Sequence, residues 1–272
     1  MATYLRDQHV ENLSFDSAAL TQLNHVFQER YNTLVAQLLA EAPQVPAGQQ
    51  QIPPAWMTYI IRFDNKGYRV FSIAELLQYF NQARNVERLI FTVESTDALS
   101  SNRARGAYLE LCVDGNDPQR CLLVSSSDNK DWAEGSFVAV HEVLTKFKTK
   151  YCVARTNLTR FAIQLLFVIL NFTASFAVAF QLAPNMKIES AFLLAVIFAL
   201  VLFGNVWGYG SQLLFASIGR AFPNIEFLRP AKAHLHWVYQ AIIGSTMFAI
   251  VVCIFGWSVS FMTSIFANVF KI

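Results

Sequence analysis

Hydrophobic residues are distributed unevenly along the chain, and its two ends follow different patterns. The C-terminal part contains three apolar blocks, residues 161–183, 191–218 and 237–270, and none of them contains a Lys, Arg, Asp or Glu. A helix that crosses a membrane needs about 20 consecutive apolar residues. A soluble helix of this length would show a polar face, which these blocks lack. The pattern therefore predicts an all-α bundle of three transmembrane helices over residues 156–272.

The charges follow the same division. Residues 1–155 carry 15 Lys and Arg against 17 Asp and Glu, whereas residues 156–272 carry 6 against 2. Basic residues mark the cytoplasmic ends of spans, and five precede the first block: Lys146, Lys148, Lys150, Arg155 and Arg160. We therefore expect an integral membrane protein, of the bacterial inner membrane, with a cytoplasmic N-terminal domain and its C-terminus outside.

The N-terminal segment 1–41 contains one amphipathic helix, expected over residues 16–41. Asp16 or Ser17 can cap it. Its apolar residues recur at steps of three and four: Leu20, Leu23, Phe27, Tyr31, Leu34 and Leu38. Such a stripe fits packing on the helix's own domain and pairing with a neighbouring subunit equally well. Residues 42–55 contain four prolines and three consecutive glutamines, which predicts a linker.

Residues 56–155 have the pattern of a compact α+β domain with the element order ββαβββα. We expect strands at 56–63, 68–71, 87–95, 107–114 and 120–127, with helices at 72–83 and 131–151. The DGNDP turn at 114–118 would join the last two strands as a hairpin. Cys112 and Cys121 are then equidistant from the turn. A disulfide between them is possible in principle, but free thiols fit a reducing compartment better.

Amide and hydroxyl side chains form one stripe on each predicted span. These candidate pore-lining residues are Gln164, Asn171 and Ser175, then Asn205 and Gln212, then Ser260, Ser264 and Asn268. Such residues serve either as hydrogen-bonding contacts between helices or as the lining of a hydrated path. Three helices cannot enclose a wide pore, so the second interpretation requires a homo-oligomer in membrane lipid.

A cluster of basic and polar residues in the α+β domain predicts a site for an anionic ligand. Guanidinium, hydroxyl and glycine chemistry suits phosphate. The candidate ligand-binding residues are Ser101, Asn102, Arg103, Arg105, Lys66, Arg69 and Lys130. The alternative is a solvated basic loop. Because the domain has no net positive charge, we expect a nucleotide or oligonucleotide rather than duplex DNA.

No catalytic motif or metal-ligand pattern stands out. His234 and His236 lack a nearby carboxylate or cysteine in the sequence, and are more typical of an interfacial anchor than of a metal site. We therefore expect no enzyme activity, no metal and no cofactor.

The layout of a cytosolic α+β domain, a basic segment and a small apolar bundle resembles membrane effectors of bacterial anti-phage defence. Within this group it is similar to the DNA-gated Hailong-type channel effector, although no motif carries the resemblance. The resemblance implies an oligomeric channel whose cytosolic domain binds an oligonucleotide signal. Our first hypothesis is accordingly a homo-oligomeric channel or permeabilising effector gated by a cytosolic sensor domain. The alternative is a structural or accessory membrane protein whose soluble domain docks a partner.

Overall fold

The computed structural model describes residues 3–41, 53–149, 156–165 and 223–228, together with isolated helical residues between 168 and 260. The chain divides into two units. The first unit comprises Met1–Lys150 and Pro223–Ala233, and the second comprises Tyr151–Phe222 and His234–Ile272. The chain thus leaves the first unit at Lys150, returns to it at Pro223 and leaves again at Ala233.

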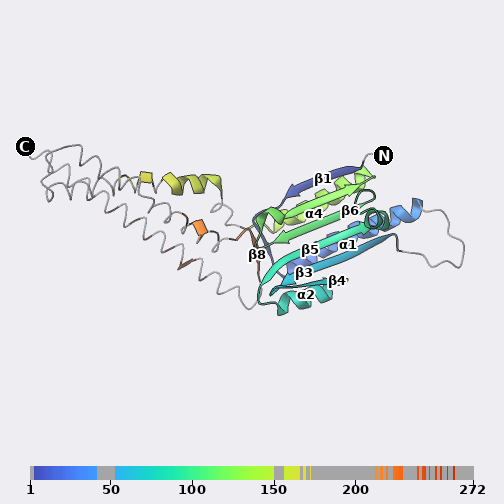
Figure 1. Ribbon diagram of the computed structural model, residues 1–272, viewed down its shortest axis with the longest axis horizontal. Coiled ribbons are helices and arrows are strands. Elements are labelled where there is room, and N and C mark those ends of the chain that lie inside the picture. Colours follow the sequence, from blue (N-terminus) through green and yellow to red (C-terminus); the bar gives the residue numbers. More distant parts are fainter. Residues whose placement is uncertain are drawn as a thin grey trace, which may run out of the picture. The chain divides into compact units, whose positions relative to one another are not determined.

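The first unit is an α+β fold around a six-stranded antiparallel sheet with the strand order β1-β7-β6-β5-β3-β4. Its strands are β1 (Tyr4–His9), β3 (Ala55–Phe63), β4 (Lys66–Val70), β5 (Val86–Ser95), β6 (Tyr108–Asp114) and β7 (Leu122–Ser127). The helices are α1 (Ser17–Glu41), α2 (Ile73–Gln82), α3 (Thr96–Ser100), the 3-10 turn η1 (Pro118–Arg120) and α4 (Lys130–Lys146). Between β3 and α4 the order of strands and longer helices is the expected ββαβββα. Figure 1 shows the sheet with α1, α2 and α4 packed along it.

Alternation along the strands directs one face of the sheet toward the three longer helices. On β5, Leu89, Phe91 and Val93 are fully buried, and the Phe91 ring lies 5.4 Å from that of Phe27 on α1. Phe137 of α4 is buried on the same side. This face carries the hydrophobic core, whereas the residues between these positions point to the opposite face.

The helix α1 begins where the sequence predicts. The Asp16 carboxylate accepts the Ala19 N–H at 2.6 Å, which caps the first turn. Leu20, Leu23 and Phe27 are fully buried in the first unit. Of the two interpretations left open for this stripe, packing on the helix's own domain is therefore confirmed.

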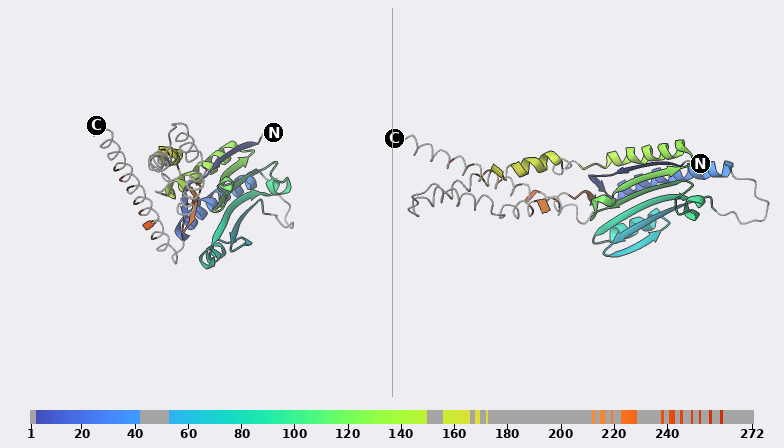
Figure 2. Two further views of the ribbon diagram at one scale, coloured as in Figure 1. Left: turned by 60° about the vertical axis from the view of Figure 1, so that its left-hand side comes forward. Right: turned by 45° about the horizontal axis from the view of Figure 1, so that its top comes forward.

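Two short strands lie outside the main sheet. Strand β2 (Leu13–Phe15) pairs in parallel with β8 (Ile225–Phe227), with Ser14 opposite Glu226. Neither of these strands was predicted from the sequence, and nor was the edge strand β1. The views in Figure 2 show β8 next to the first unit, to which it belongs.

The fold class predicted for the second half of the chain needs correction. Among the described residues, none of the helices combines the length and the apolar character needed to cross a membrane. The finding overturns the predicted bundle of three transmembrane helices, the inner-membrane localisation and the orientation derived from it. The physical reason is that a span needs one unbroken helix as well as an uncharged stretch. Most of the three apolar blocks lie outside the described residues.

The candidate pore-lining residues are accordingly only partly described. Gln164, Gln212 and Ser260 are helical and exposed. Asn171, Ser175, Asn205, Ser264 and Asn268 lie outside the described residues, as do the histidines His234 and His236.

Candidate functional site

The face of the sheet opposite the helices contains a pocket of about 310 Å³. Its floor is formed by neighbouring residues of four adjacent strands, β4, β3, β5 and β6. Ile60 of β3 lies opposite Arg69 of β4 on one side and Ile90 of β5 on the other. Thr92 of β5 lies opposite Thr58 of β3 and Glu110 of β6. The complete lining consists of Trp56, Thr58, Ile60, Arg69, Phe71, Ile90, Thr92, Glu94, Leu99, Arg103 and Glu110.

Large apolar side chains stand exposed around this pocket. Trp56 keeps 40% of its surface exposed, Phe71 66% and Leu99 58%. They come from β3, from the residue after β4 and from α3, so three separate elements bring them to one place. Exposed apolar groups gathered around a concave surface are typical of a binding site.

Arg103 closes one side of the pocket through an ionic network. Its guanidinium pairs with Glu94 and, at 2.6 Å, with Glu110. It also lies 5.0 Å from the centroid of the Tyr108 ring. Burial lowers the pKa of Arg103, but the hydrogen bonds and charges of the two carboxylates outweigh it and raise the pKa overall. One guanidinium thus neutralises part of the charge of two carboxylates.

A tight loop places Arg103 over the sheet. Asn102 and Arg103 have φ values of 53° and 68°, and Gly106 has a φ of 82°. A Cβ at Gly106 would lie 2.6 Å from Ser95 Oγ and 2.7 Å from Ala98 N, so this position requires glycine. The Ser101 hydroxyl accepts the Arg105 N–H at 3.0 Å and thereby stabilises the loop.

Arg69 is the unmatched cation of the pocket. It is exposed on β4, and no ion pair joins it to any other residue in the part of the chain that the structure describes. The pocket lining carries two positive charges, on Arg69 and Arg103, and two negative charges, on Glu94 and Glu110, so its formal net charge is zero. Because Arg103 binds both carboxylates, the Arg69 guanidinium is available to bind an anionic ligand.

The seven residues predicted to bind an anion do not converge. Only Arg69 and Arg103 line the same pocket. Ser101 is engaged in its own loop, and Lys66 lies at the β3–β4 turn. Lys130 begins α4, with its ammonium 5.8 Å from the Tyr4 ring centroid. Asn102 and Arg105 are exposed in the loop but are not part of the pocket lining.

Sequence reasoning missed the apolar half of this pocket. A signal was present, because Trp56, Thr58 and Ile60 alternate with Tyr59 and Ile61, which point into the core. The outward positions of a strand covered on one side should be polar, and a Trp and an Ile there mark an unusual surface.

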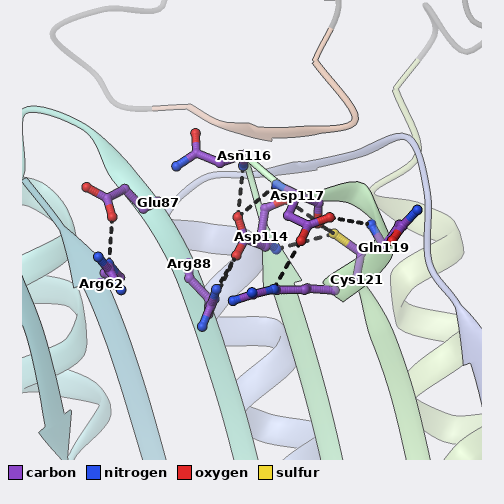
Figure 3. Close-up of polar contacts among 9 residues, drawn as sticks. Arg62, Glu87, Arg88, Asp114, Asn116, Asp117, Gln119 and Cys121 are labelled. Atoms are coloured by element: carbon purple, nitrogen blue, oxygen red, sulfur yellow. Dashed lines mark hydrogen bonds and ion pairs between the residues drawn. The ribbon is translucent and has the colours of Figure 1, made fainter. Parts of the chain in front are cut away.

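A second, polar cleft of about 590 Å³ lies at the turns that follow β3 and β6 and at the residues where β5 begins. Figure 3 shows two of its arginines matched with carboxylates, Arg62 with Glu87 and Arg88 with Asp114. A third, Arg120, pairs with Asp117 at 3.0 Å. The Asp114 carboxylate also accepts the N–H groups of Asn116 and Asp117 at 2.8 and 3.1 Å.

The carboxylates of this cleft therefore stabilise the turns. Although burial raises the pKa of Asp114, the hydrogen bonds from Arg88 and the two backbone N–H groups lower it below its usual value. Among the described residues, no group of three His, Cys, Asp or Glu side chains could hold a metal ion.

Both described cysteines are free thiols, which confirms that prediction. The prediction that Cys112 and Cys121 lie opposite each other in the hairpin was wrong by one residue, because Leu122 is the partner of Cys112. Cys121 is fully buried, whereas Cys112 is only partly buried.

Comparisons of the chain with protein-family models, with curated proteins and with solved structures find no match. No relative therefore supports the channel and antiviral-defence terms expected from the layout. The geometry of the first unit is the basis for a functional proposal.

Proposed function

We propose that the first unit is a non-enzymatic recognition module that binds a small planar, anionic ligand in the pocket on the open face of its sheet. The observation that carries the proposal is the combination in one pocket of exposed apolar groups at Trp56 and Phe71 with the unmatched Arg69 guanidinium. The volume of about 310 Å³ lies at the lower end of the range for small-molecule sites.

Each part of the pocket has a role in this binding mode. The planar body of the ligand stacks against Trp56 and contacts Phe71 and Leu99, which removes apolar surface from water. The anionic group pairs with Arg69. The carboxylates of Glu94 and Glu110, held by Arg103, accept hydrogen bonds from donor groups at the edge of the planar body.

Mononucleotides combine these features, and they are the first probes. Isothermal titration of the full chain with a panel of mononucleotides is expected to give saturable binding. The matching nucleosides, which lack the anion, should bind more weakly. Arg69→Ala should weaken binding by about ten- to a hundredfold, because a charged hydrogen-bonding partner is lost.

Arg105→Ala is the matched control, since Arg105 is an exposed arginine of the neighbouring loop outside the pocket. It should leave the affinity unchanged. Trp56→Ala should lower the affinity for nucleotide and nucleoside alike, by about tenfold, through lost stacking. Equal losses in the two arginine variants, or no saturable binding, would overturn the proposal.

The second candidate function is protein docking on the same surface. It is favoured by the exposure of Trp56, Phe71 and Leu99, which are anchors of the kind found at interfaces. If the chain self-associates through this surface, sedimentation should show a concentration-dependent oligomer that Trp56→Glu dissociates. Nucleotide titration and sedimentation thus separate the two functions.

A further inference from the structure

Strand β2 contacts two segments that are far apart in the sequence. On one side Ser14 N donates to Phe147 O at 2.9 Å, and Thr149 N donates to Asn12 O at 2.8 Å. On the other side Leu13 N donates to Asn224 O at 3.0 Å, and Leu228 N donates to Phe15 O at 2.8 Å. The end of α4 and residues 224–228 are therefore joined through three residues of β2.

Residues 224–228 pack against aromatic rings of the first unit. The Phe227 ring lies 6.3 Å from Phe15 and 6.4 Å from Phe80 of α2. Ile225 beside it is 2% exposed. Phe227 also packs against the β6–η1 turn, because a Cβ placed on Gly115 would lie 3.4 Å from its ring. In Figure 3 the segment that carries β8 passes next to this turn.

Residues 224–228 are anchored at Asn12 and lie against the turn that contains a buried thiol. The Asn224 side-chain oxygen accepts the Asn12 N–H at 2.9 Å, and Asn224 is 5% exposed. The Cys121 thiol is fully buried, and its sulfur accepts the Asp114 N–H at 3.3 Å, in the turn whose Gly115 lies against the Phe227 ring. Opening of residues 224–228 would uncover this turn, so we expect it to increase access to Cys121.

Several features make this attachment weaker than the main sheet. The ladder contains three residue pairs in a separate two-stranded parallel sheet, whereas the neighbouring strands β3 and β5 pair over nine residues. Two-stranded sheets are marginal by themselves, and parallel pairing is slightly weaker per residue. Glu226, Phe227 and Leu228 also remain only partly buried.

We propose that Asn224–Leu228 is a reversible latch that docks on β2 and opens while the six-stranded sheet stays folded. When it is docked, both ends of residues 151–222 are held at β2. When it opens, β2 keeps its hydrogen bonds to Phe147 and Thr149 and loses those to Asn224 and Leu228. The latch is thus a conformational device of the first unit that sets whether residues 224–228 are held at β2.

The test compares the opening at Cys121 with global unfolding in the full chain. Alkylation of Cys121 under native conditions, followed by peptide mass spectrometry, measures the first process. Hydrogen exchange of amides in β5 and α4 measures the second. In the wild type, Cys121 should become accessible at least about tenfold more often than these amides, as expected for a local opening.

Phe227→Ala should increase alkylation of Cys121 by about tenfold, because an aromatic contact of the latch is lost, and should leave exchange in β5 unchanged. Val138→Ala, an exposed position on α4, is the control and should change neither measurement. Cys112, partly buried on β6, serves as the internal reference for reagent reactivity. If alkylation of Cys121 follows the core amides in the wild type, residues 224–228 are a permanent part of the fold and the proposal is wrong.

Discussion

The pocket on the sheet face and the polar cleft at the strand ends both combine arginines with carboxylates, yet they differ in how the charges are used. In the polar cleft, Arg88 and Asp114 lie in contact, and Asp114 is also bound to the backbone of its turn. In the sheet-face pocket, Arg103 pairs with carboxylates, whereas Arg69 has no ion pair among the described residues, and the exposed Trp56 lines the same pocket. Clustered charge alone therefore does not mark a ligand site. The proposed site differs from the polar cleft in combining an arginine that has no ion pair among the described residues with exposed apolar side chains.

The largest effect that tests this comparison is expected from Asp114→Ala. The substitution removes the partner of Arg88 and two acceptor bonds of the turn, and it leaves a partly buried guanidinium unmatched. We expect a loss of about 3–5 kcal/mol in the free energy of unfolding of the first unit. Hydrogen exchange of the β6 amides measures it.

Asp7→Ala is the control for this variant, because Asp7 is an exposed carboxylate on the edge strand β1. It should change the free energy of unfolding by less than about 0.5 kcal/mol. If Asp114→Ala lowered the free energy of unfolding equally little, the charges of the polar cleft would not be needed for stability, and the cleft would become a candidate ligand site.

A smaller effect is expected from Gly106→Ala at the loop that carries Arg103. The added Cβ meets Ser95 Oγ and Ala98 N while φ stays at 82°, so the loop must move. We expect a cost of about 1–3 kcal/mol and a loss of nucleotide binding, because Arg103 no longer holds Glu94 and Glu110. Calorimetry of binding and urea denaturation measure the two effects.

Gly67→Ala serves as the comparison, since no atom lies within 4 Å of a Cβ placed there. It should preserve nucleotide binding. A Gly106→Ala protein that binds as well as the wild type would separate the loop from the pocket.

The smallest expected effect is a dependence of stability on acid pH. Because the pKa of Asp114 in the folded state is lowered below its ordinary value, its contribution to stability is complete above that ordinary value, near pH 4. The contribution is lost as pH falls through the lowered pKa. Denaturation between pH 5 and 2 should show a steeper loss in the wild type than in Asp114→Asn. Identical slopes would mean that Arg88 and the turn do not favour the ionised form.

Local periodicity was sufficient to predict part of this fold. The helix α1 and the order from β3 to α4 follow from apolar residues spaced at three to four or at two positions. Strand β1 was missed because most of its residues are exposed and polar at the sheet edge. Strands β2 and β8 were missed because each has three residues and its partner lies far away in the sequence.

The predicted ligand site was limited in the same way. Charge identified Arg69 and Arg103, but nothing in the sequence showed that Glu94 and Glu110 would bind Arg103 from adjacent strands. The hydropathy of residues 161–270 predicted membrane spans, whereas the described helices contain none that could cross a membrane.

Placing β8 after residues 151–222 has a consequence for synthesis of the protein. The ribosome releases β2 long before β8, which emerges only after all the residues between the two strands have been translated. Until then the Leu13 amide and the Phe15 carbonyl lack the acceptor and donor that Asn224 and Leu228 provide. The first unit can therefore assemble its main sheet during translation, while completion of its last strand pair awaits the nascent chain beyond Leu228.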